Sequence, residues 1–194
     1  MGFKIAILIS GRGSNMLNII KACNDKRLCS SVNLVVSNKS NAHGLKIAGR
    51  YKVGTHVLDN KNFSKEIFEN LLDKILKEKN INLICLAGFM KILSKDFVKQ
   101  WPKMILNIHP SILPSFKGLN AQQQAIDNNA EYSGCTVHFV NEKMDGGEII
   151  DQKIVDISTE DDVNSLSKKI LMEEHKLYIK VIKELEKSFG KVKQ

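Results

Sequence analysis

Short apolar runs alternate with segments of helical periodicity along the first half of the chain. The runs at residues 4–10, 32–38, 55–59 and 81–88 have the length and composition of buried β-strands. Apolar residues recur at helical spacing in 16–23, 44–51 and 64–79, and the last of these segments predicts an amphipathic helix with a charged outer face. This alternation is typical of a parallel sheet with helices on its faces.

The second half has a mixed pattern. We expect a short helix at 94–100, a fifth strand at 104–109 and irregular backbone at 110–118, where proline and glycine interrupt any regular pattern. After a helix at 122–128, alternating segments at 134–144 and 147–157 flank Asp145-Gly146-Gly147, a turn sequence that favours antiparallel pairing. A final amphipathic helix follows, with Thr159 as its expected N-cap.

No internal repeat, low-complexity tract or linker divides the 194 residues. We therefore expect one α/β domain spanning residues 1–194. Its Rossmann-like central sheet is expected to be mostly parallel, with flanking helices and an antiparallel portion towards the C-terminus.

Composition and charge narrow the classes of function. No stretch reaches the roughly 18 apolar residues of a membrane span, and no secretory signal precedes the first strand, so we expect a cytoplasmic protein without membrane partners. Neither the four cysteines nor the five histidines show metal-binding spacing, and we expect reduced thiols and no metal. The net charge is +8, but the basic residues are scattered along the chain and only three of them are arginines. This pattern favours a solvated basic surface over nucleic-acid binding.

A glycine-rich turn, Gly11-Arg12-Gly13-Ser14-Asn15, joins the first strand to the first helix. Free backbone amides at a helix start attract a phosphate, aided by the helix dipole. The turn matches neither the dinucleotide fingerprint nor a Walker loop. Taken alone, it supports a phosphate site and a plain strand-to-helix turn equally.

Asn107 and His109 stand at the carboxyl end of the fifth expected strand, where open α/β sheets place their ligands. Because strand side chains alternate, these two point to one side and Ile108 points to the other. An amide that stabilises an oxyanion and an imidazole that acts as acid or base suit acyl transfer. The alternative is a polar strand end whose side chains satisfy nearby backbone groups.

Asp145 also has two interpretations. Asp-Gly is a common hairpin turn and needs no chemical role. If Asp145 lies beside His109, its carboxylate favours the imidazolium and orients the ring. His138, within the segment 134–144, is interpreted as a hydrogen-bonded core residue or as support for a neighbouring site.

The segments SGRGSN, SNK, LAGFMKILS, LNIHPSILPSFKG, GCTVHFV and MDGGEIIDQ resemble, in this order and over nearly the whole chain, the glycinamide ribonucleotide (phosphoribosylglycinamide) formyltransferases, a folate-dependent family. The resemblance implies formyl transfer from 10-formyltetrahydrofolate to the amine of glycinamide ribonucleotide in purine biosynthesis, through a tetrahedral intermediate and without a metal. It also implies a phosphate-binding half at 1–100 and a catalytic and folate-binding half at 101–194. The partners would be small molecules, and the protein a monomer or a homodimer.

The resemblance also assigns roles to individual residues. The catalytic trio would be Asn107, His109 and Asp145. The positions that match contacts to the phosphate and the rest of glycinamide ribonucleotide are Gly13, Ser14, Asn15 and Glu174; for Glu174, a solvated helix position is the less favoured alternative. The positions that match folate contacts are Lys65, where some relatives carry arginine, and Met90, Lys91, Ile92, Leu93, Asn141, Glu142, Lys143 and Met144.

Other functions fit parts of the sequence. A formyltetrahydrofolate deformylase uses a similar trio with water as the nucleophile, but usually carries a regulatory domain. A methionyl-tRNA formyltransferase normally adds an RNA-binding domain, and sugar-amine formyltransferases stand as further alternatives. A non-catalytic phosphate-binding module needs only GRGSN and leaves the trio unexplained. An assay that separates amine transfer from folate hydrolysis discriminates among these classes.

Overall fold

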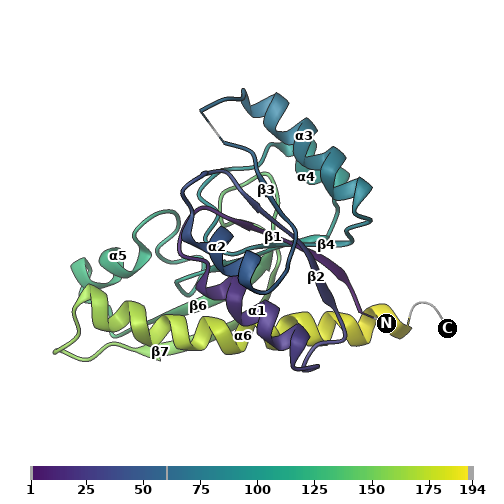
Figure 1. Ribbon diagram of the computed structural model, residues 1–194. Coiled ribbons are helices and arrows are strands. Elements are labelled where there is room, and N and C mark those ends of the chain that lie inside the picture. Colours follow the sequence, from purple (N-terminus) through teal and green to yellow (C-terminus); the bar gives the residue numbers. More distant parts are fainter. Residues whose placement is uncertain (1, 60, 192–194) are drawn as a thin grey trace.

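A seven-stranded sheet in the order β3-β2-β1-β4-β5-β6-β7 forms the centre of the computed structural model, which describes residues 2–59 and 61–191 (Figure 1). The parallel strands are β1 (Lys4–Ile9), β2 (Ser31–Ser37), β3 (Thr55–Val57), β4 (Leu83–Leu86) and β5 (Ile105–His109). Strands β6 (Tyr132–Phe139) and β7 (Ile149–Asp156) extend the sheet in antiparallel pairing. The predicted α/β class, mostly parallel sheet and antiparallel portion are confirmed.

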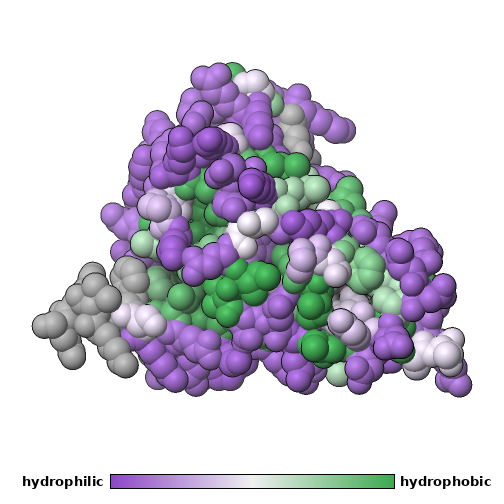
Figure 2. All heavy atoms as spheres, turned by 180° about the vertical axis from the view of Figure 1, so that it is seen from behind, coloured by the Kyte–Doolittle hydropathy of each residue, from purple (hydrophilic) through white to green (hydrophobic). Residues whose placement is uncertain are grey.

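Helices cover the two faces of this sheet. On one face, α1 (Ser14–Asn24), α2 (His43–Arg50), α5 (Ala121–Asp127) and α6 (Val163–Lys191) pack in one apolar cluster. On the other face, α3 (Lys65–Glu78) and α4 (Lys95–Gln100) pack in a second cluster. Residues 5–9 of β1 alternate between the two clusters and are all buried, which explains their uninterrupted apolar run. From behind, hydrophilic residues cover most of the periphery, and hydrophobic surface gathers in the middle (Figure 2).

The start of α6 differs from the prediction. The helix begins at Val163, and Asp162 caps it: Asp162 Oδ1 accepts from the backbone N–H of Ser165 at 2.7 Å, and Ser165 Oγ accepts from the N–H of Asp162 at 3.0 Å. This reciprocal capping arrangement satisfies free backbone donors of the first turn. Thr159 lies before the helix, so its predicted role as the N-cap was wrong.

The connection between β6 and β7 also differs from a tight hairpin. Strand β6 ends at Phe139 and β7 begins at Ile149, so the predicted strand over 134–144 was too long and Asp145 lies in the connecting segment 140–148. A Cβ on Gly147 would lie 1.7 Å from the carbonyl oxygen of Phe139. Glycine is therefore required where the segment returns to the sheet, rather than in a two-residue turn.

Candidate active site

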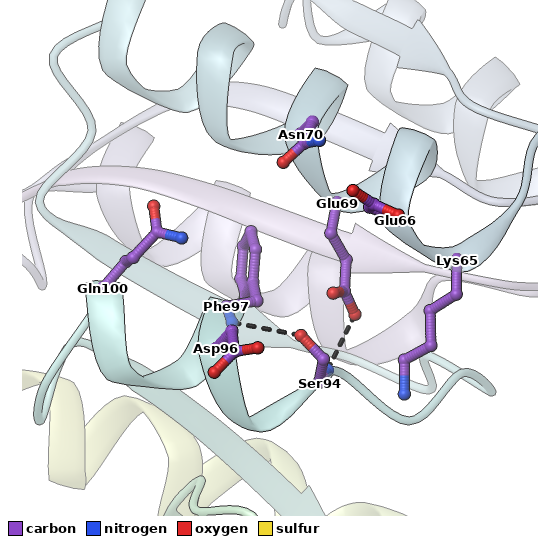
Figure 3. A pocket seen from close by; sticks show the side chains of 8 residues that line it. All are labelled: Lys65, Glu66, Glu69, Asn70, Ser94, Asp96, Phe97 and Gln100. Atoms are coloured by element: carbon purple, nitrogen blue, oxygen red, sulfur yellow. Dashed lines mark hydrogen bonds between the residues drawn. The ribbon is translucent and has the colours of Figure 1, made fainter.

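Two hollows lie near the carboxyl ends of the parallel strands. The smaller, of about 430 Å³, lies between α3 and α4 and is lined by Lys65, Glu66, Glu69, Asn70, Ser94, Asp96, Phe97 and Gln100 (Figure 3). Glu69 of α3 accepts a hydrogen bond from the backbone N–H of Ser94, the residue before α4, at 2.7 Å. The larger, of about 640 Å³, is a cleft where the strand order reverses between β1 and β4, the position at which open α/β sheets bind ligands.

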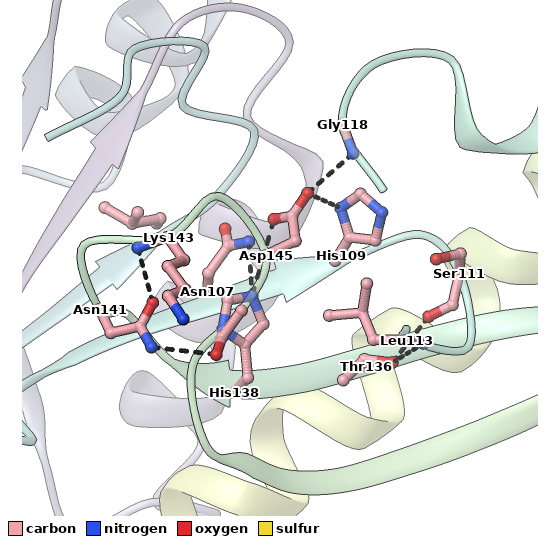
Figure 4. A network of polar contacts seen from close by, with 12 residues as sticks. Asn107, His109, Ser111, Leu113, Gly118, Thr136, His138, Asn141, Lys143 and Asp145 are labelled. Atoms are coloured by element: carbon pink, nitrogen blue, oxygen red, sulfur yellow. Dashed lines mark hydrogen bonds and ion pairs between the residues drawn. The ribbon is translucent and has the colours of Figure 1, made fainter. Parts of the chain in front are cut away.

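The two polar residues of β5 line this cleft. Asn107 and His109 point to one side of the strand, and Ile108 packs in the opposite apolar cluster, as the alternation predicts. His109 is 5% exposed, and its Nε2 is 2.9 Å from the carbonyl oxygen of Phe116. Its Nδ1 is 3.4 Å from Asp145 Oδ2 (Figure 4). Both ring nitrogens face acceptors, so a protonated ring can donate from each.

Asp145 comes from a different part of the chain and meets His109 in space. Its backbone has φ 47°, a left-handed conformation that Asp tolerates better than most residues. Its Oδ2 also accepts from the N–H of Gly118 at 2.8 Å, so the carboxylate joins the segment 140–148 to the loop that follows β5. Asp145 is therefore more than a turn residue: it is the carboxylate partner of His109.

Asn107 has a partner that the sequence did not point to. Its Nδ2 is 3.1 Å from Nε2 of His138, which lies opposite it in the antiparallel register of β5 and β6. Burial lowers the pKa of His138, whereas the backbone contact to Phe139 and the charge of Asp145 raise it. His138 lines the cleft, so of its two predicted roles, support for a neighbouring site describes it better.

The glycine-rich turn forms the start of α1. Gly13 has φ 78°, and a Cβ there would lie 2.8 Å from Cα of Gly44, whose N–H donates to the carbonyl oxygen of Gly11 at 3.0 Å. This close approach requires glycine at position 13. Gly13 and Ser14 are not among the residues that line the cleft, whereas Asn15 is. The first amides of α1 lack partners within the helix and are available to an anion.

Glu174 of α6 lies beside Asn15 on the cleft wall. It is 7% exposed, so its interpretation as a solvated helix position was wrong, and its Oε2 accepts from Asn15 Nδ2 at 2.8 Å. Burial raises the pKa of Glu174 to about 7, and the hydrogen bond from Asn15 acts in the opposite direction. Asn15 Oδ1 is buried and has no hydrogen-bond partner among the described residues, so it is available to a ligand.

Most of the predicted folate positions also line the cleft. They are Met90, Lys91, Ile92, Leu93, Asn141, Lys143 and Met144. Ser10 Oγ accepts from the N–H of Met90 at 2.7 Å and fixes the backbone after β4. Within 140–148, Asn141 bonds both the N–H of Lys143 and the carbonyl oxygen of Gly146 at 2.9 Å.

Two predicted folate positions lie elsewhere, and several cleft residues were not predicted. Lys65 lines the smaller pocket and Glu142 lines neither hollow. The cleft residues without a predicted role in binding or catalysis are Leu86, Gly88, Phe89, Ile108, Pro110, Gly118, Leu119, Asn120, Gln122, His138 and Val140. Leu119 and Asn120 reach the cleft because positive φ values at Phe116, Gly118 and Asn120 turn the loop after β5 back over it, a path without a periodic signature.

Groups that would indicate other chemistry are not assembled in residues 2–59 and 61–191. No three His, Cys, Asp or Glu side chains there are placed to hold a metal ion. The cysteines Cys23, Cys29, Cys85 and Cys135 are free. Within the same described segments, no helix is long and apolar enough to cross a membrane.

Comparisons with known proteins agree on one family. Residues 3–182 match the family model described as "Formyl transferase". The phosphoribosylglycinamide formyltransferase of Haemophilus influenzae is 41% identical over 181 residues, 93% of this chain and 85% of that protein. The trifunctional purine biosynthetic protein adenosine-3 of Gallus gallus is 44% identical over 176 residues, and this chain spans only 18% of its length. The crystal structure of glycinamide ribonucleotide transformylase 1 from Symbiobacterium toebii superposes with a TM-score of 0.94 at 37% identity, covering 96% of this chain and 89% of that one.

Proposed function

This chain belongs to the formyl transferase family, and we propose that it transfers a formyl group from 10-formyltetrahydrofolate to the amine of glycinamide ribonucleotide. The observation that carries the proposal is the meeting of Asn107, His109 and Asp145 in one cleft, with Asn15 and Glu174 on its wall. The names of the relatives in Haemophilus and Symbiobacterium support the same acceptor.

The reaction requires stabilisation of a negative charge on oxygen. The amine attacks the formyl carbon, a carbon–nitrogen bond forms, and the formyl oxygen becomes an oxyanion. Collapse of this tetrahedral intermediate breaks the bond to N10 of the folate; N10 gains a proton and the amine loses one. Asn107 and His109 both line the cleft, and the Asn107 amide and a protonated His109 would stabilise the oxyanion.

Asp145 supports this role of His109. Its carboxylate lies 3.4 Å from Nδ1 of His109 and would hold the ring in its orientation. The Nε2–H of His109 is held by the Phe116 carbonyl, so direct donation to a substrate requires the substrate to replace that carbonyl. While the hydrogen bond to Phe116 is kept, a protonated His109 would stabilise the oxyanion through its charge alone. Because His109 is buried, water would screen this interaction only weakly.

The two substrates would enter from different sides of the trio. The phosphate of glycinamide ribonucleotide would bind at the start of α1 through Gly13, Ser14 and Asn15, and its glycinamide end would contact Glu174. Folate would lie against residues 90–93 and 141–144. Lys65 lies in the neighbouring pocket and would contact only the far end of the folate. Both partners are small molecules, no metal takes part, and the assignment implies a cytoplasmic enzyme of purine biosynthesis, monomeric or homodimeric.

A steady-state assay tests the proposal and separates it from hydrolysis by a deformylase. Purified protein is given 10-formyltetrahydrofolate with or without glycinamide ribonucleotide, and tetrahydrofolate and free formate are measured. We expect tetrahydrofolate to form only when the amine is present, without formate. Equal rates with and without the amine, with formate as the product, would identify a hydrolase. The same assay with an amino sugar as the acceptor tests the sugar-amine alternative. Transfer to the amino sugar, but not to glycinamide ribonucleotide, would identify a sugar-amine formyltransferase.

A further inference from the structure

His138 combines deep burial with a defined hydrogen-bonding pattern. It is 2% exposed, its Nδ1 is 2.9 Å from the carbonyl oxygen of Phe139, and its Nε2 is 3.1 Å from Asn107 Nδ2 (Figure 4). A carbonyl oxygen only accepts, so the hydrogen of the neutral ring lies on Nδ1. Nε2 then carries a lone pair and accepts a hydrogen bond from the Asn107 amide.

This contact decides the orientation of the Asn107 amide. The two ends of an asparagine amide have nearly the same shape, so hydrogen bonds determine which end lies on which side. A half-turn of the amide would set its Oδ1 against the lone pair on Nε2 of His138, and two acceptors would face each other. With the amide as it lies, one Nδ2 hydrogen goes to His138 and the second remains to donate.

We propose that His138 is a positioning residue that holds the Asn107 amide with its nitrogen towards β6, so that the second Nδ2 hydrogen donates to the oxygen of the reacting formyl group. The inference rests on the proposed function and concerns a residue to which the family resemblance assigned no role. His138 itself need not touch a substrate.

The arrangement requires a neutral His138. A protonated ring carries a hydrogen on Nε2 as well, cannot accept from Asn107, and has Asp145 Oδ1 at 3.8 Å as its alternative partner. Burial lowers the pKa of His138; the charged groups that act on it are Asp145, which raises the pKa, and His109, which lowers it. The rate of transfer is therefore expected to fall as the pH drops through this lowered pKa.

A double-mutant cycle tests whether His138 acts through Asn107. His138→Leu cannot accept a hydrogen bond, and we expect it to lower kcat about tenfold or more while KM for the amine changes less than about twofold. In the Asn107→Ala background the same change should lower kcat by less than about twofold further. Equal losses in both backgrounds would show that His138 acts independently of Asn107 and would overturn the inference.

A conservative variant separates positioning from packing. In His138→Gln, Oε1 can accept near the position of Nε2 and does not titrate. We expect kcat within about threefold of the parent and a smaller acid-side fall in rate than in the parent, because protonation of the acceptor amine still lowers the rate but protonation of residue 138 no longer does. His56→Gln, at an exposed position of β3, is the matched control and should keep both kcat and the acid-side fall. A folded His138→Gln as inactive as His138→Leu would contradict the inference.

The tautomer can be measured without any assay of activity. Nitrogen-15 NMR of the unmodified protein should show the hydrogen of the His138 ring on Nδ1, and a hydrogen on Nε2 would overturn the inference. The experiments distinguish failure of the proposed function from failure of the role proposed for His138. A parent protein that transfers no formyl group refutes the proposed function, whereas a parent that transfers it but gives additive variants refutes only the role of His138.

Discussion

The burial of Glu174 in the cleft can be tested quantitatively, because ionisation of its carboxyl group in the folded chain costs free energy. The carboxyl is 7% exposed, and burial raises its pKa to about 7, compared with an ordinary value of 4.5. This difference corresponds to about 3 kcal/mol of free energy of unfolding. The amide of a Glu174→Gln variant has similar shape and no charge, so the pH-dependent cost disappears.

The sign follows from proton linkage. Between pH 4.5 and about 7 the folded chain binds the Glu174 proton and the unfolded chain releases it. The contribution to stability is therefore fully present below the unfolded pKa and is lost as the pH rises to the folded pKa. Relative to the parent, Glu174→Gln should gain about 2 to 3 kcal/mol in the free energy of unfolding between about pH 5 and about pH 8.5.

Urea unfolding of both proteins at the two pH values measures this gain. Glu173→Gln is the matched control, because the neighbouring, partly buried Glu173 forms an ion pair with the exposed Lys176 on the same helix. Its difference from the parent should change little with pH. If Glu174→Gln and the parent differ by the same free energy of unfolding at both pH values, ionisation of Glu174 costs little in the folded chain and its pKa is not raised by burial.

The remaining predictions concern kinetics. Ser14→Ala and Asn15→Ala should raise KM for the ribonucleotide far more than KM for folate; equal effects on the two constants, measured in parallel, would make the turn purely structural. Asn107→Ala should lower kcat about a hundred- to a thousandfold while the free energy of unfolding stays the same, and His109→Ala should lower kcat at least as much. Asp145→Asn should lower kcat, because His109 loses the carboxylate that lies against its Nδ1. A nearly unchanged kcat in Asp145→Asn would argue against the trio.

The fold was predictable where a local signal and the tertiary structure agree. The apolar run of β1 marks a strand covered on both faces, and the periodicity of α3 marks a helix with one buried side. The start of α6 was missed because two nearby residues are good N-caps. Thr159 had the spacing of a capping box with Asp162, but Asp162 itself makes the reciprocal bonds with Ser165.

The site was only partly predictable, because its contacts join distant parts of the chain. The shared face of Asn107 and His109 follows from strand alternation alone. The contact between His109 and Asp145 needs the path of the segment 140–148, and the contact between Asn107 and His138 needs the register of β5 and β6. The sequence patterns of turns and strands predict neither the path of this segment nor the register of these two strands.

In the proposed reaction, one carbon–nitrogen bond forms at the amine of glycinamide ribonucleotide as another breaks at the folate. Carbon-13 in the formyl group of the folate and nitrogen-15 in the amine of the acceptor allow both to be followed by NMR. We expect the carbon-13 signal to move to the product and to show a one-bond coupling to nitrogen-15. A label that appears instead as free formate, without coupling to nitrogen, would rule out transfer to the amine.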